Sequence, residues 1–588
     1  RTLTRNLTLN GIPEELALQA FAAVRAATCQ SQGIRLHPEQ LFAGWAMLHG
    51  CLAEMQTGEG KTLTAALPAI VMALARTPVH VVTVNDYLVR RDADQLKGLY
   101  QLFGLQVGTV VEESGTEERR LAYAADVVYC TNKQLVFDYL RDLQLLGESR
   151  AGLKSQVRSL LSSDSQRPVM RGLCFAIVDE ADSSLIDDAR TPLILAQPAG
   201  GNRDMATEAA VALSIARGLH ADADFLLQEN SRAARLTDSG RDALRALAER
   251  LNGVWRFERY RNELVQQALS ALHLFRQDRD YLVKDDKILL IDESTGRVLP
   301  DRKLQHGLHR MLEVKEKCTV TEDNEVVAAI SFQRFFSRYH HLSGMSGTLA
   351  EVRGELRHIY GLEVVRVPSH RPCQRVMDHS QVLKDTETQL TQAIEEVAAR
   401  HSAGQPVLVG TRTVEMSERF SALLKERGIR HQLLNARQDA EEAAIVARAG
   451  QAHAVSVATN MAGRGTDIPL DDEARKLGGL HVISLEVNES QRVERQLFGR
   501  GARQGDPGSA QSVVSLEDEL VQSALPRKFL QPVGFLVRRL PMAGAWLSRA
   551  AVRYSQWACE RRHRIQRLRI YNGSEALNRR LAVGGDME

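Results

Sequence analysis

The stretch that most constrains this chain is residues 53–62, with the sequence AEMQTGEGKT. Its last six residues are typical of a phosphate-binding loop, because glycines let backbone N–H groups approach a polyphosphate closely. Lys61 supplies a positive charge for the phosphates, and the Thr62 hydroxyl can bind Mg²⁺. The residues that follow predict a helix whose positive N-terminus faces the phosphates. Its apolar positions are Leu63, Ala65, Ala66, Leu67, Ile70, Val71 and Leu74.

The loop departs from the usual pattern at one position. Met55 stands where the consensus has glycine, six residues before Lys61, although the G-x-G-K-T half is intact. The alternative interpretation is a glycine-containing turn with an incidental lysine. Whether the loop binds a nucleotide therefore has to be judged from other motifs in the chain.

A second acidic pattern lies where such a site needs it. Leu173–Val178 is an apolar run that continues directly into Asp179 and Glu180, and the β-branched run Val79–Val84 predicts another buried strand. Two acids at the end of a strand form a Walker B arrangement, in which Asp179 can hold Mg²⁺ through water and Glu180 can polarise the attacking water. The alternative is a strand that ends in surface acids. It is less favoured because a phosphate loop precedes this strand, at a distance along the chain that suits neighbouring strands of a parallel sheet.

Gln40 lies about twenty residues before the loop. Its amide offers both a donor and an acceptor, which suits the edge of an adenine base. A lone glutamine at such a position is more often a solvated surface residue.

Composition sets broad limits on the chain. Its 588 residues are 44% hydrophobic and 25% charged with a formal net charge of +2, a balance typical of about three to four globular domains. Seven cysteines without a C-x-x-C pair suit a reducing compartment and argue against a zinc site. No apolar run approaches the ~18–20 residues that span a bilayer, and no secretory signal is expected at the start.

The pattern changes between residues 196 and 328. Alanine- and arginine-rich helical stretches meet two short strands, residues 280–283 and 288–292, with Asp285-Asp286 as a hairpin turn between them. We interpret residues 196–328 as a domain inserted into a first nucleotide-binding lobe, formed by residues 1–195 and 329–370.

A second α/β lobe is expected over residues 371–525. Two glycine-flanked arginine segments lie in it, residues 459–467 and 496–506. Arg500 and Arg503 are candidates for an arginine finger, which needs a planar, permanently charged donor on a closely approaching backbone. The alternative is a set of surface arginines in a glycine-rich loop.

Residues 526–588 predict a short helical tail with a basic face and nearby aromatic residues. This face could bind anionic lipid or nucleic acid, or it could be the solvated side of a helix that packs on the lobes. Its arginines are Arg561, Arg562, Arg564, Arg567 and Arg569, with Trp546, Leu547 and Trp557 nearby.

Taken together, these residues resemble the SecA family of preprotein translocase ATPases from about Phe21 to Glu519. The run ARTPLI after the acidic pair and the run DESTGRVLP are the most diagnostic, and Met55 is the family's own usage. The other matching segments are AEMQTGEGKT, VTVNDYLVRRDA, YCTNKQLVFDYLRD, SGMSGT, QPVLVGT, ATNMAGRGTDI and QLFGRGARQGDPGS.

The resemblance implies a fold and an activity. The fold would be α/β, with two RecA-like P-loop NTPase lobes in a DEAD-like helicase core, an inserted preprotein-crosslinking domain and a short helical tail. The activity would be that of an ATPase that moves unfolded preproteins through the SecYEG channel. Implied partners are preprotein, SecYEG, an anionic phospholipid surface and a second copy of the chain, with nucleic acid disfavoured. The implied location is the cytoplasm and the inner face of the bacterial cytoplasmic membrane.

The resemblance also assigns site residues by position. Gln40 matches the adenine-sensing glutamine, Asp506 matches an ATP-contacting acid, and Arg503 takes the finger position beside Arg500. ATP and Mg²⁺ would be the ligands, without zinc, and the metal would be held by Thr62 and Asp179 with Glu180 as the second Walker B acid. The loop residues that contact nucleotide would be Gly58, Glu59, Gly60, Lys61 and Thr62.

Four departures from the family pattern leave alternatives open. Family members continue well beyond the second lobe, whereas about sixty residues follow it here. Phe498 stands where the family has arginine, Ala502 where it has glycine, and Asp188 where glutamate is commoner. A shortened paralogue that binds nucleotide without transport, and less so a nucleic-acid helicase, remain alternatives.

Overall fold

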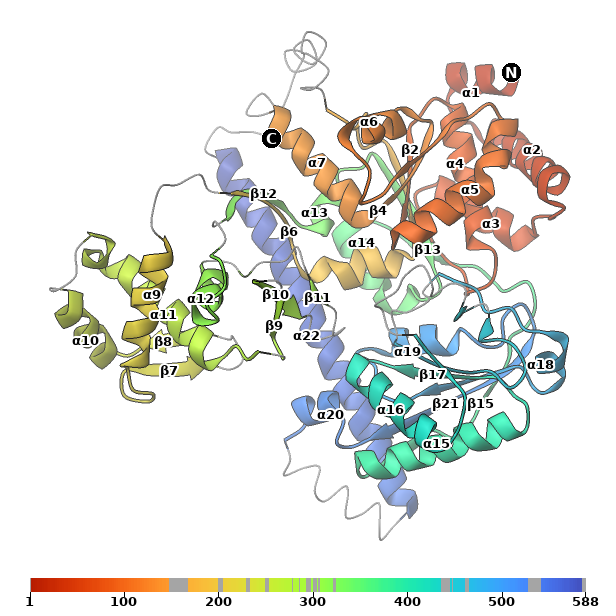
Figure 1. Ribbon diagram of the computed structural model, residues 1–588. Helices are drawn as coiled ribbons and strands as arrows, with labels where there is room; N and C mark the ends of the chain where they lie inside the picture. Colours follow the sequence, from red (N-terminus) through yellow and green to blue (C-terminus); the bar gives the residue numbers. More distant parts are fainter. Residues whose placement is uncertain are drawn as a thin grey trace. The chain divides into compact units, whose positions relative to one another are not determined.

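We describe the protein from a computed structural model. Its backbone falls into two compact units, one formed by residues 1–195 and 328–588 and the other by residues 196–327, and Figure 1 traces both along the chain. No described helix is long and apolar enough to cross a membrane. The described residues are 2–146, 168–198, 205–228, 233–248, 253–277, 279–284, 286–291, 298–299, 304, 307–320, 324–434, 445–446, 448–459, 465–526 and 541–583.

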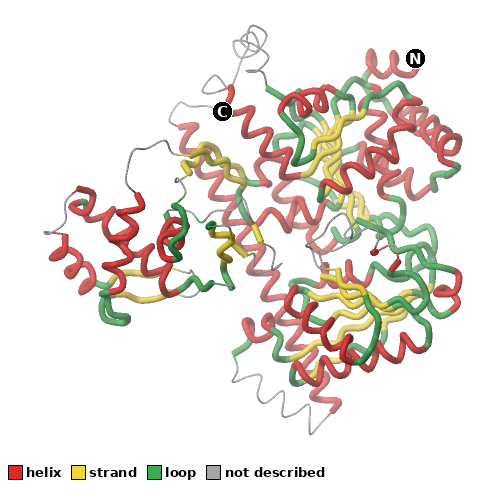
Figure 2. The backbone as a smooth tube through the Cα atoms, viewed as in Figure 1, coloured by secondary structure: helices red, strands yellow, loops and turns green. Residues whose placement is uncertain are grey.

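The first lobe of the larger unit is a seven-stranded parallel sheet in the order β14-β1-β13-β5-β2-β4-β3. Two of its strands, β13 and β14, come from beyond residue 328, so the sheet is completed by a distant part of the chain. Figure 2 shows this sheet and that of the second lobe as separate groups of strands. The strands are β1 (Leu52–Glu54), β2 (Val79–Thr83), β3 (Val107–Val110), β4 (Val127–Thr131), β5 (Phe175–Asp179), β13 (His341–Ser346) and β14 (Val364–Arg366).

The central strands of this sheet are buried along their whole length, which is why they read as continuous apolar runs rather than as alternating ones. Helix α4 is also apolar on almost all sides because it packs inside the first core. The helices of this lobe are α1 (Thr2–Asn10), α2 (Glu14–Gln32), α3 (Pro38–Leu48), α4 (Lys61–Leu74), α5 (Asp86–Leu102), α6 (Thr116–Ala124), α7 (Asn132–Leu146), η2 (Ser183–Asp187), η3 (Asp188–Arg190), α13 (Phe332–Phe336), η6 (Ala350–Val352) and α14 (Arg353–Tyr360).

The second lobe is another parallel sheet, in the order β15-β21-β20-β17-β19-β18 with β16 also paired to β21. Its strands are β15 (Gln374–Met377), β16 (Gln381–Leu383), β17 (Val407–Thr411), β18 (Gln432–Leu434), β19 (Val455–Thr459), β20 (Leu480–Ser484) and β21 (Pro507–Ser515). Its helices include α15 (Thr386–Ser402), α16 (Val414–Glu426), α18 (Asp472–Lys476), α19 (Gln491–Phe498) and α20 (Glu519–Ala524).

The tail contains one long helix, α22 (Pro541–Val583). The sequence placed Arg567 on its exposed basic face, and this is wrong. Arg567 is buried, and its guanidinium donates to both oxygens of Glu355 in α14 at 2.6 and 2.8 Å. Helical periodicity could not reveal this, because the partner carboxylate lies some two hundred residues earlier.

The smaller unit has a hydrophobic core of its own. The strands predicted on either side of Asp285-Asp286 pair antiparallel as β9 and β10; Asp285 itself lies outside the described residues. Its elements are α9 (Met205–Arg217), β7 (Phe225–Gln228), β8 (Ala233–Leu236), α10 (Asp238–Ala248), η5 (Gly253–Arg256), α11 (Glu258–His273), β9 (Tyr281–Lys284), β10 (Lys287–Ile291), β11 (Val298–Leu299) and α12 (Leu308–Lys315). Strands β6 (Leu193–Pro198) and β12 (Asn324–Ile330) pair with each other.

Candidate active site

The phosphate loop connects β1 to the N-terminus of α4, which begins at Lys61. Gly58 and Gly60 both have positive φ, 89° and 76°, a conformation that other residues adopt only with strain. A Cβ at Gly60 would also lie 2.4 Å from the side-chain nitrogen of Gln40. The two glycines are therefore required by the backbone of the loop itself.

Met55 has a structural reason to replace the consensus glycine. Its N–H donates to the carbonyl of Ser346 at 3.0 Å and so prolongs the hydrogen bonding between β1 and β13. Its side chain is 1% exposed and belongs to the first-lobe core. The position is thus the end of a buried strand, and the tight turn starts after it.

Gln40 braces the loop from α3. Its Nε2 donates to the carbonyl of Glu59 at 3.0 Å, and its Oε1 accepts from the N–H of His37 at 2.9 Å. The side chain is largely buried. The structure therefore brings Gln40 to the phosphate loop, and its contact with adenine stays a prediction.

The two acids of the Walker B segment lie beside the loop lysine. Lys61 Nζ donates to Glu180 Oε1 at 2.6 Å, and both side chains are largely buried. Burial works to lower the pKa of Lys61, but the charges of Glu180 and Asp179 outweigh it and raise that pKa, so the amine stays protonated. Burial, reinforced by the charge of Glu180, raises the pKa of Asp179 to about 7.

Glu180 is held in an unusual backbone conformation. Its φ is 48°, and its N–H donates to Asp179 Oδ1 at 2.9 Å. Residues kept at positive φ without being glycine concentrate at functional sites, where the surrounding structure fixes them. This geometry turns the Glu180 side chain away from the strand direction and toward Lys61.

The arginine segment of the second lobe meets the phosphate loop directly. Thr57 Oγ1 donates to the carbonyl of Gly499 at 2.7 Å, and Gln504 Nε2 donates to the carbonyl of Gly58 at 3.0 Å. Arg503 Nε donates to the Gly499 carbonyl at 2.9 Å, and its guanidinium also pairs with Asp467. The arginine at the finger position is thus within the same site as the loop.

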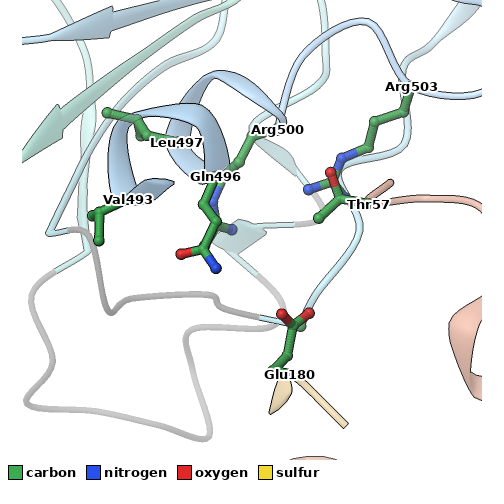
Figure 3. Close-up of a pocket in the computed structure, with 8 residues that line it drawn as sticks. Thr57, Glu180, Val493, Gln496, Leu497, Arg500 and Arg503 are labelled. Atoms are coloured by element: carbon green, nitrogen blue, oxygen red, sulfur yellow. The ribbon is translucent and has the colours of Figure 1, made fainter. Parts of the chain in front are cut away.

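A small pocket lies between the lobes beside these residues. Figure 3 shows Glu180 on one side of it and Gln496, Arg500 and Arg503 on the other. Cations from one lobe therefore face a carboxylate from the other, as phosphoryl transfer requires. The lining residues are Thr57, Glu180, Gly465, Val493, Gln496, Leu497, Arg500 and Arg503.

Comparison with known families shows to which protein family the chain belongs. The family model for the SecA DEAD-like domain matches residues 1–357, and the model for the SecA P-loop domain matches residues 372–476 and 471–531. The chain belongs to the SecA family. The predictions of a SecA-type α/β fold with a DEAD-like core, and of a P-loop ATPase, are confirmed.

Curated relatives of this SecA chain have the same assignment. It is 48% identical over 515 residues to protein translocase subunit SecA 2 of Nitrosospira multiformis. This alignment covers 87% of the chain and 77% of that protein. It is 45% identical over 595 residues to SecA 3 of Magnetococcus marinus, covering 100% and 89%. A solved DEAD-box helicase, Mss116 bound to ssRNA and UDP-BeF, aligns at 13% identity with a TM-score of 0.44, covering 88% of this chain and 76% of that one.

Among the predicted site residues of this SecA chain, Glu180, Arg500 and Arg503 line the pocket, whereas Gln40, residues 58–62, Asp179 and Asp506 do not. Asp506 accepts a hydrogen bond from Arg475 Nε at 3.2 Å, and its N–H donates to the Arg503 carbonyl at 2.8 Å. Thr62 lies in the first turn of α4, next to Lys61. Residues 460–464, part of the first predicted arginine segment, lie outside the described residues.

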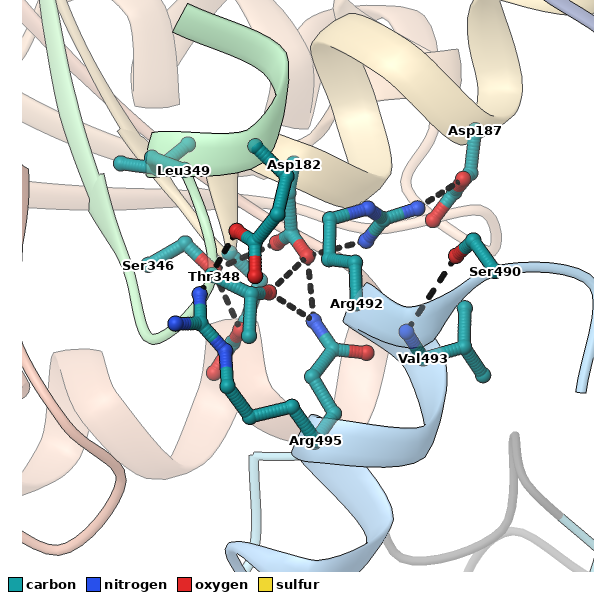
Figure 4. A network of polar contacts seen from close by, with 12 residues as sticks. Asp182, Asp187, Ser346, Thr348, Leu349, Ser490, Arg492, Val493 and Arg495 are labelled. Carbon is teal, nitrogen blue, oxygen red and sulfur yellow. Dashed lines mark hydrogen bonds and ion pairs between the residues drawn. The ribbon is translucent and has the colours of Figure 1, made fainter. Parts of the chain in front are cut away.

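Sequence reasoning missed a buried network between the two SecA lobes, shown in Figure 4. Asp182, fully buried, accepts from Ser346 Oγ at 2.5 Å and from Thr348 Oγ1 at 2.7 Å. It also pairs with Arg492, which reaches Asp187 as well. Burial works to lower the pKa of Arg492, but the two carboxylates raise it.

A signal for this network was present in the sequence. Arg492, Gln496 and Arg500 are spaced four residues apart, which places the first two on one face of α19 with the third just beyond its end. Gln496 Nε2 also donates to Asp182. The polar face of α19 thus joins the Walker B region to the pocket.

Proposed function

We propose that this SecA-family chain couples ATP hydrolysis in the interlobe pocket to the movement of unfolded preproteins through a translocation channel. The observation that carries the proposal is the pocket itself, where Glu180 of one lobe faces Arg500 and Arg503 of the other. A site divided between two lobes links a change in the nucleotide to a change in lobe contacts.

The nucleotide site would hold ATP and Mg²⁺. Gly58, Gly60 and Lys61 would cradle the phosphates at the N-terminus of α4, with Gln40 at the adenine. Oxygen ligands are what Mg²⁺ prefers, and Thr62 and Asp179 supply them. The bound ion would neutralise charge on the phosphate oxygens.

The chain's own residues would then act in sequence. Arriving phosphates would compete with Glu180 for the charge of Lys61, and they would draw Arg503 away from Asp467. Glu180, once released, would orient the attacking water and accept its proton. Arg500 and Arg503 would stabilise the charge that develops on the transferred phosphoryl group.

The Asp182–Arg492 pair would carry this change to the lobe contact. Asp182 lies two residues beyond Glu180, and Arg492 lies on the helix that leads to Arg500. A shift of Glu180 during turnover would therefore move Asp182 and change its contact with Arg492 of the other lobe. The contact between the lobes would have two arrangements, and the bound nucleotide would favour one of them.

The remaining assignments follow from the family. We assign residues 1–195 with 329–370 to the first lobe, 371–525 to the second, 196–328 to a preprotein-crosslinking-like domain and 526–588 to a partial scaffold. The partners would be preprotein, the SecYEG channel, an anionic phospholipid surface and a second copy of the chain. The protein would work in the cytoplasm, at the inner face of the cytoplasmic membrane.

The test is steady-state ATP hydrolysis by the purified chain, alone and with SecYEG-containing vesicles plus an unfolded preprotein. We expect vesicles and preprotein together to stimulate turnover. Lys61→Ala should lose tight ATP binding, whereas Glu180→Gln should bind ATP and hydrolyse it at least 10²-fold more slowly.

Three results would contradict the proposal in different ways. Hydrolysis without any response to vesicles and preprotein would leave the ATPase site standing but make the chain an accessory nucleotide-binding protein. Stimulation by RNA in place of preprotein would make it a helicase. Parent-like turnover in both Lys61→Ala and Glu180→Gln would remove the site assignment itself.

A further inference from the structure

Two histidine rings stack on each other beside the phosphate loop. The ring centres of His37 and His370 lie 3.7 Å apart, and their planes are inclined by 23°. Both side chains are exposed, so the pair adds little to the hydrophobic core. His37 caps the N-terminus of α3 in the first lobe, whereas His370 lies in the segment that leads from β14 to β15 of the second lobe. The stack therefore joins the first lobe to the connection between the lobes.

Two glutamates next to the loop hold His370 in place. Its N–H donates to Glu59 Oε2 at 3.2 Å, and its ring Nδ1 lies 3.4 Å from Glu39 Oε2. The carbonyl of Glu59 in turn accepts from Gln40 Nε2 at 3.0 Å. His370 therefore approaches His37 from the side of the phosphate loop, where Gln40 lies.

His37 lies where a base bound by Gln40 would find a stacking partner. Gln40 is the predicted adenine contact, and its Oε1 accepts from the His37 N–H at 2.9 Å. Its amide can form further hydrogen bonds, because the oxygen has two lone pairs and the nitrogen two hydrogens. A purine whose edge meets this amide would place its face on the neighbouring ring, as bases do on aromatic side chains.

The two rings leave no room for a base between them. Atoms in contact lie about 3.5–4.0 Å apart, so a base held between the rings would need their centres to be about 7–8 Å apart. At the observed separation of 3.7 Å, His370 fills the space that the base would take. A base and His370 can therefore stack on this face of His37 only in turn.

We propose that His37 is the stacking surface for the adenine base and that His370 competes with adenine for it. This inference rests on the nucleotide site proposed above and adds to it a residue that sets the affinity for the base. Adenine has the larger ring system and gains hydrogen bonds at Gln40. It can therefore displace an imidazole that is held by one stack and two glutamates. His370 would lower the affinity for adenine nucleotides without contacting phosphate.

Displacement of His370 would also reach the second lobe. The next residue, Arg371, packs against Gly505, where an added Cβ would lie 3.0 Å from Arg371 Cδ. Gly505 follows the candidate finger Arg503 by two residues. Base binding at His37 would therefore move a segment that packs on the arginine segment.

The experiment compares the affinity of the full chain for a ligand with the base and for the same ligand without it. Isothermal titration calorimetry is carried out with ADP and with ribose 5-diphosphate, each with Mg²⁺. His37→Ala should weaken ADP binding at least about fivefold, the lower end of what one base–aromatic stack contributes. His37→Phe, which keeps an aromatic face, should bind ADP within about threefold of the parent. Ribose 5-diphosphate binding should be unchanged in both variants.

Variants at His370 distinguish competition from direct binding. His370→Ala removes the competitor and should tighten ADP binding at least threefold, whereas His370→Trp offers a larger ring and should weaken it at least threefold. Both should bind ribose 5-diphosphate as the parent does. His340→Ala is the matched control, because this exposed histidine precedes β13, at the end of the parallel strands opposite to the phosphate loop. It should bind both ligands as the parent does.

Three results would overturn this inference and leave the phosphate site standing. Weaker ADP binding in His370→Ala would make His370 a partner of the base rather than its competitor. Equal changes in the affinities for ADP and ribose 5-diphosphate would place the effect in the phosphate loop, through Glu59. Unchanged binding of both ligands in every variant would reduce the histidine pair to surface packing. A parent chain that binds neither ligand would instead remove the nucleotide site of the proposed function, and this inference with it.

Discussion

The buried pair between Arg567 of α22 and Glu355 of α14 sets how firmly the long helix is attached. Both side chains are only 4% exposed, and two hydrogen bonds at 2.6 and 2.8 Å join them. Arg567→Ala would leave the Glu355 carboxylate buried without its counter-charge. Removing one member of such a pair costs about 3–5 kcal/mol. At about 1.4 kcal/mol per factor of ten, local detachment of the helix would become roughly 10² to 10⁴ times more frequent.

The assay is amide hydrogen exchange, which measures opening segment by segment. Protection of the α22 amides around residue 567 should fall by that factor in Arg567→Ala, while β5 in the core of the first lobe stays protected. Arg561→Ala is the matched control, because it removes the same side chain from a solvent-facing position of the same helix. It should change protection by less than a factor of about three, as surface substitutions generally do.

A double variant separates charge from packing. Arg567→Met/Glu355→Leu removes both charges and keeps apolar volume, and such replacements are neutral or stabilising in other proteins. We expect it to restore most of the protection that Arg567→Ala loses. Equal loss in the single and double variants would refute the reasoning, because the pair would then act through specific geometry rather than through an uncompensated charge. Unchanged protection in Arg567→Ala would show that the ion pair does not hold the helix.

Three further predictions concern the lobes. Gly60→Ala should weaken ATP binding at least tenfold in a fluorescent-nucleotide titration, because φ is positive there and a Cβ would meet the amide that braces the loop; Gly98→Ala, with open space around it, should bind ATP normally. Arg503→Ala should slow turnover by ~10³ and spare binding, and a parent-like rate would exclude it as the finger. Burial lowers the pKa of His80 to about 4, so its contribution to stability is present above the unfolded value of about 6.5 and is lost as pH falls toward 4; thermal unfolding of His80→Phe should depend less on pH between 6.5 and 4.5.

The sequence was sufficient for the parts of the fold that rest on local pattern. The strand that ends at Asp179 and the helix that begins at Lys61 are both as expected, because continuous apolar runs and a glycine-rich loop report burial and backbone geometry directly. The antiparallel pairing of β9 and β10 was also predicted from its turn. Met55 violated the consensus, and the structure explains it as a buried strand end rather than as part of the turn.

The parts that the sequence could not give depend on contacts between distant segments. Arg567 looked like a surface arginine because its neighbours are exposed arginines, and only Glu355 makes it a buried residue. Asp182 is one acid among several after β5, and only Arg492 and the hydroxyls of Ser346 and Thr348 make it the centre of a network. Such roles depend on which elements the fold brings together, and helical or strand periodicity carries no information about that.

The charges of the candidate site are balanced by the protein itself. Lys61 is neutralised by Glu180, and Arg503 by Asp467. A site lined with unpaired buried cations would be costly to fold, whereas here Lys61 and Arg503 each have a carboxylate that phosphate can replace. Glu180 cannot act as a base while it holds Lys61, so ATP binding itself would free the carboxylate needed for hydrolysis. The replacement of Glu180 by phosphate at Lys61 would therefore both bind the nucleotide and free Glu180 for catalysis. Without nucleotide, Glu180 would stay paired with Lys61 and inactive.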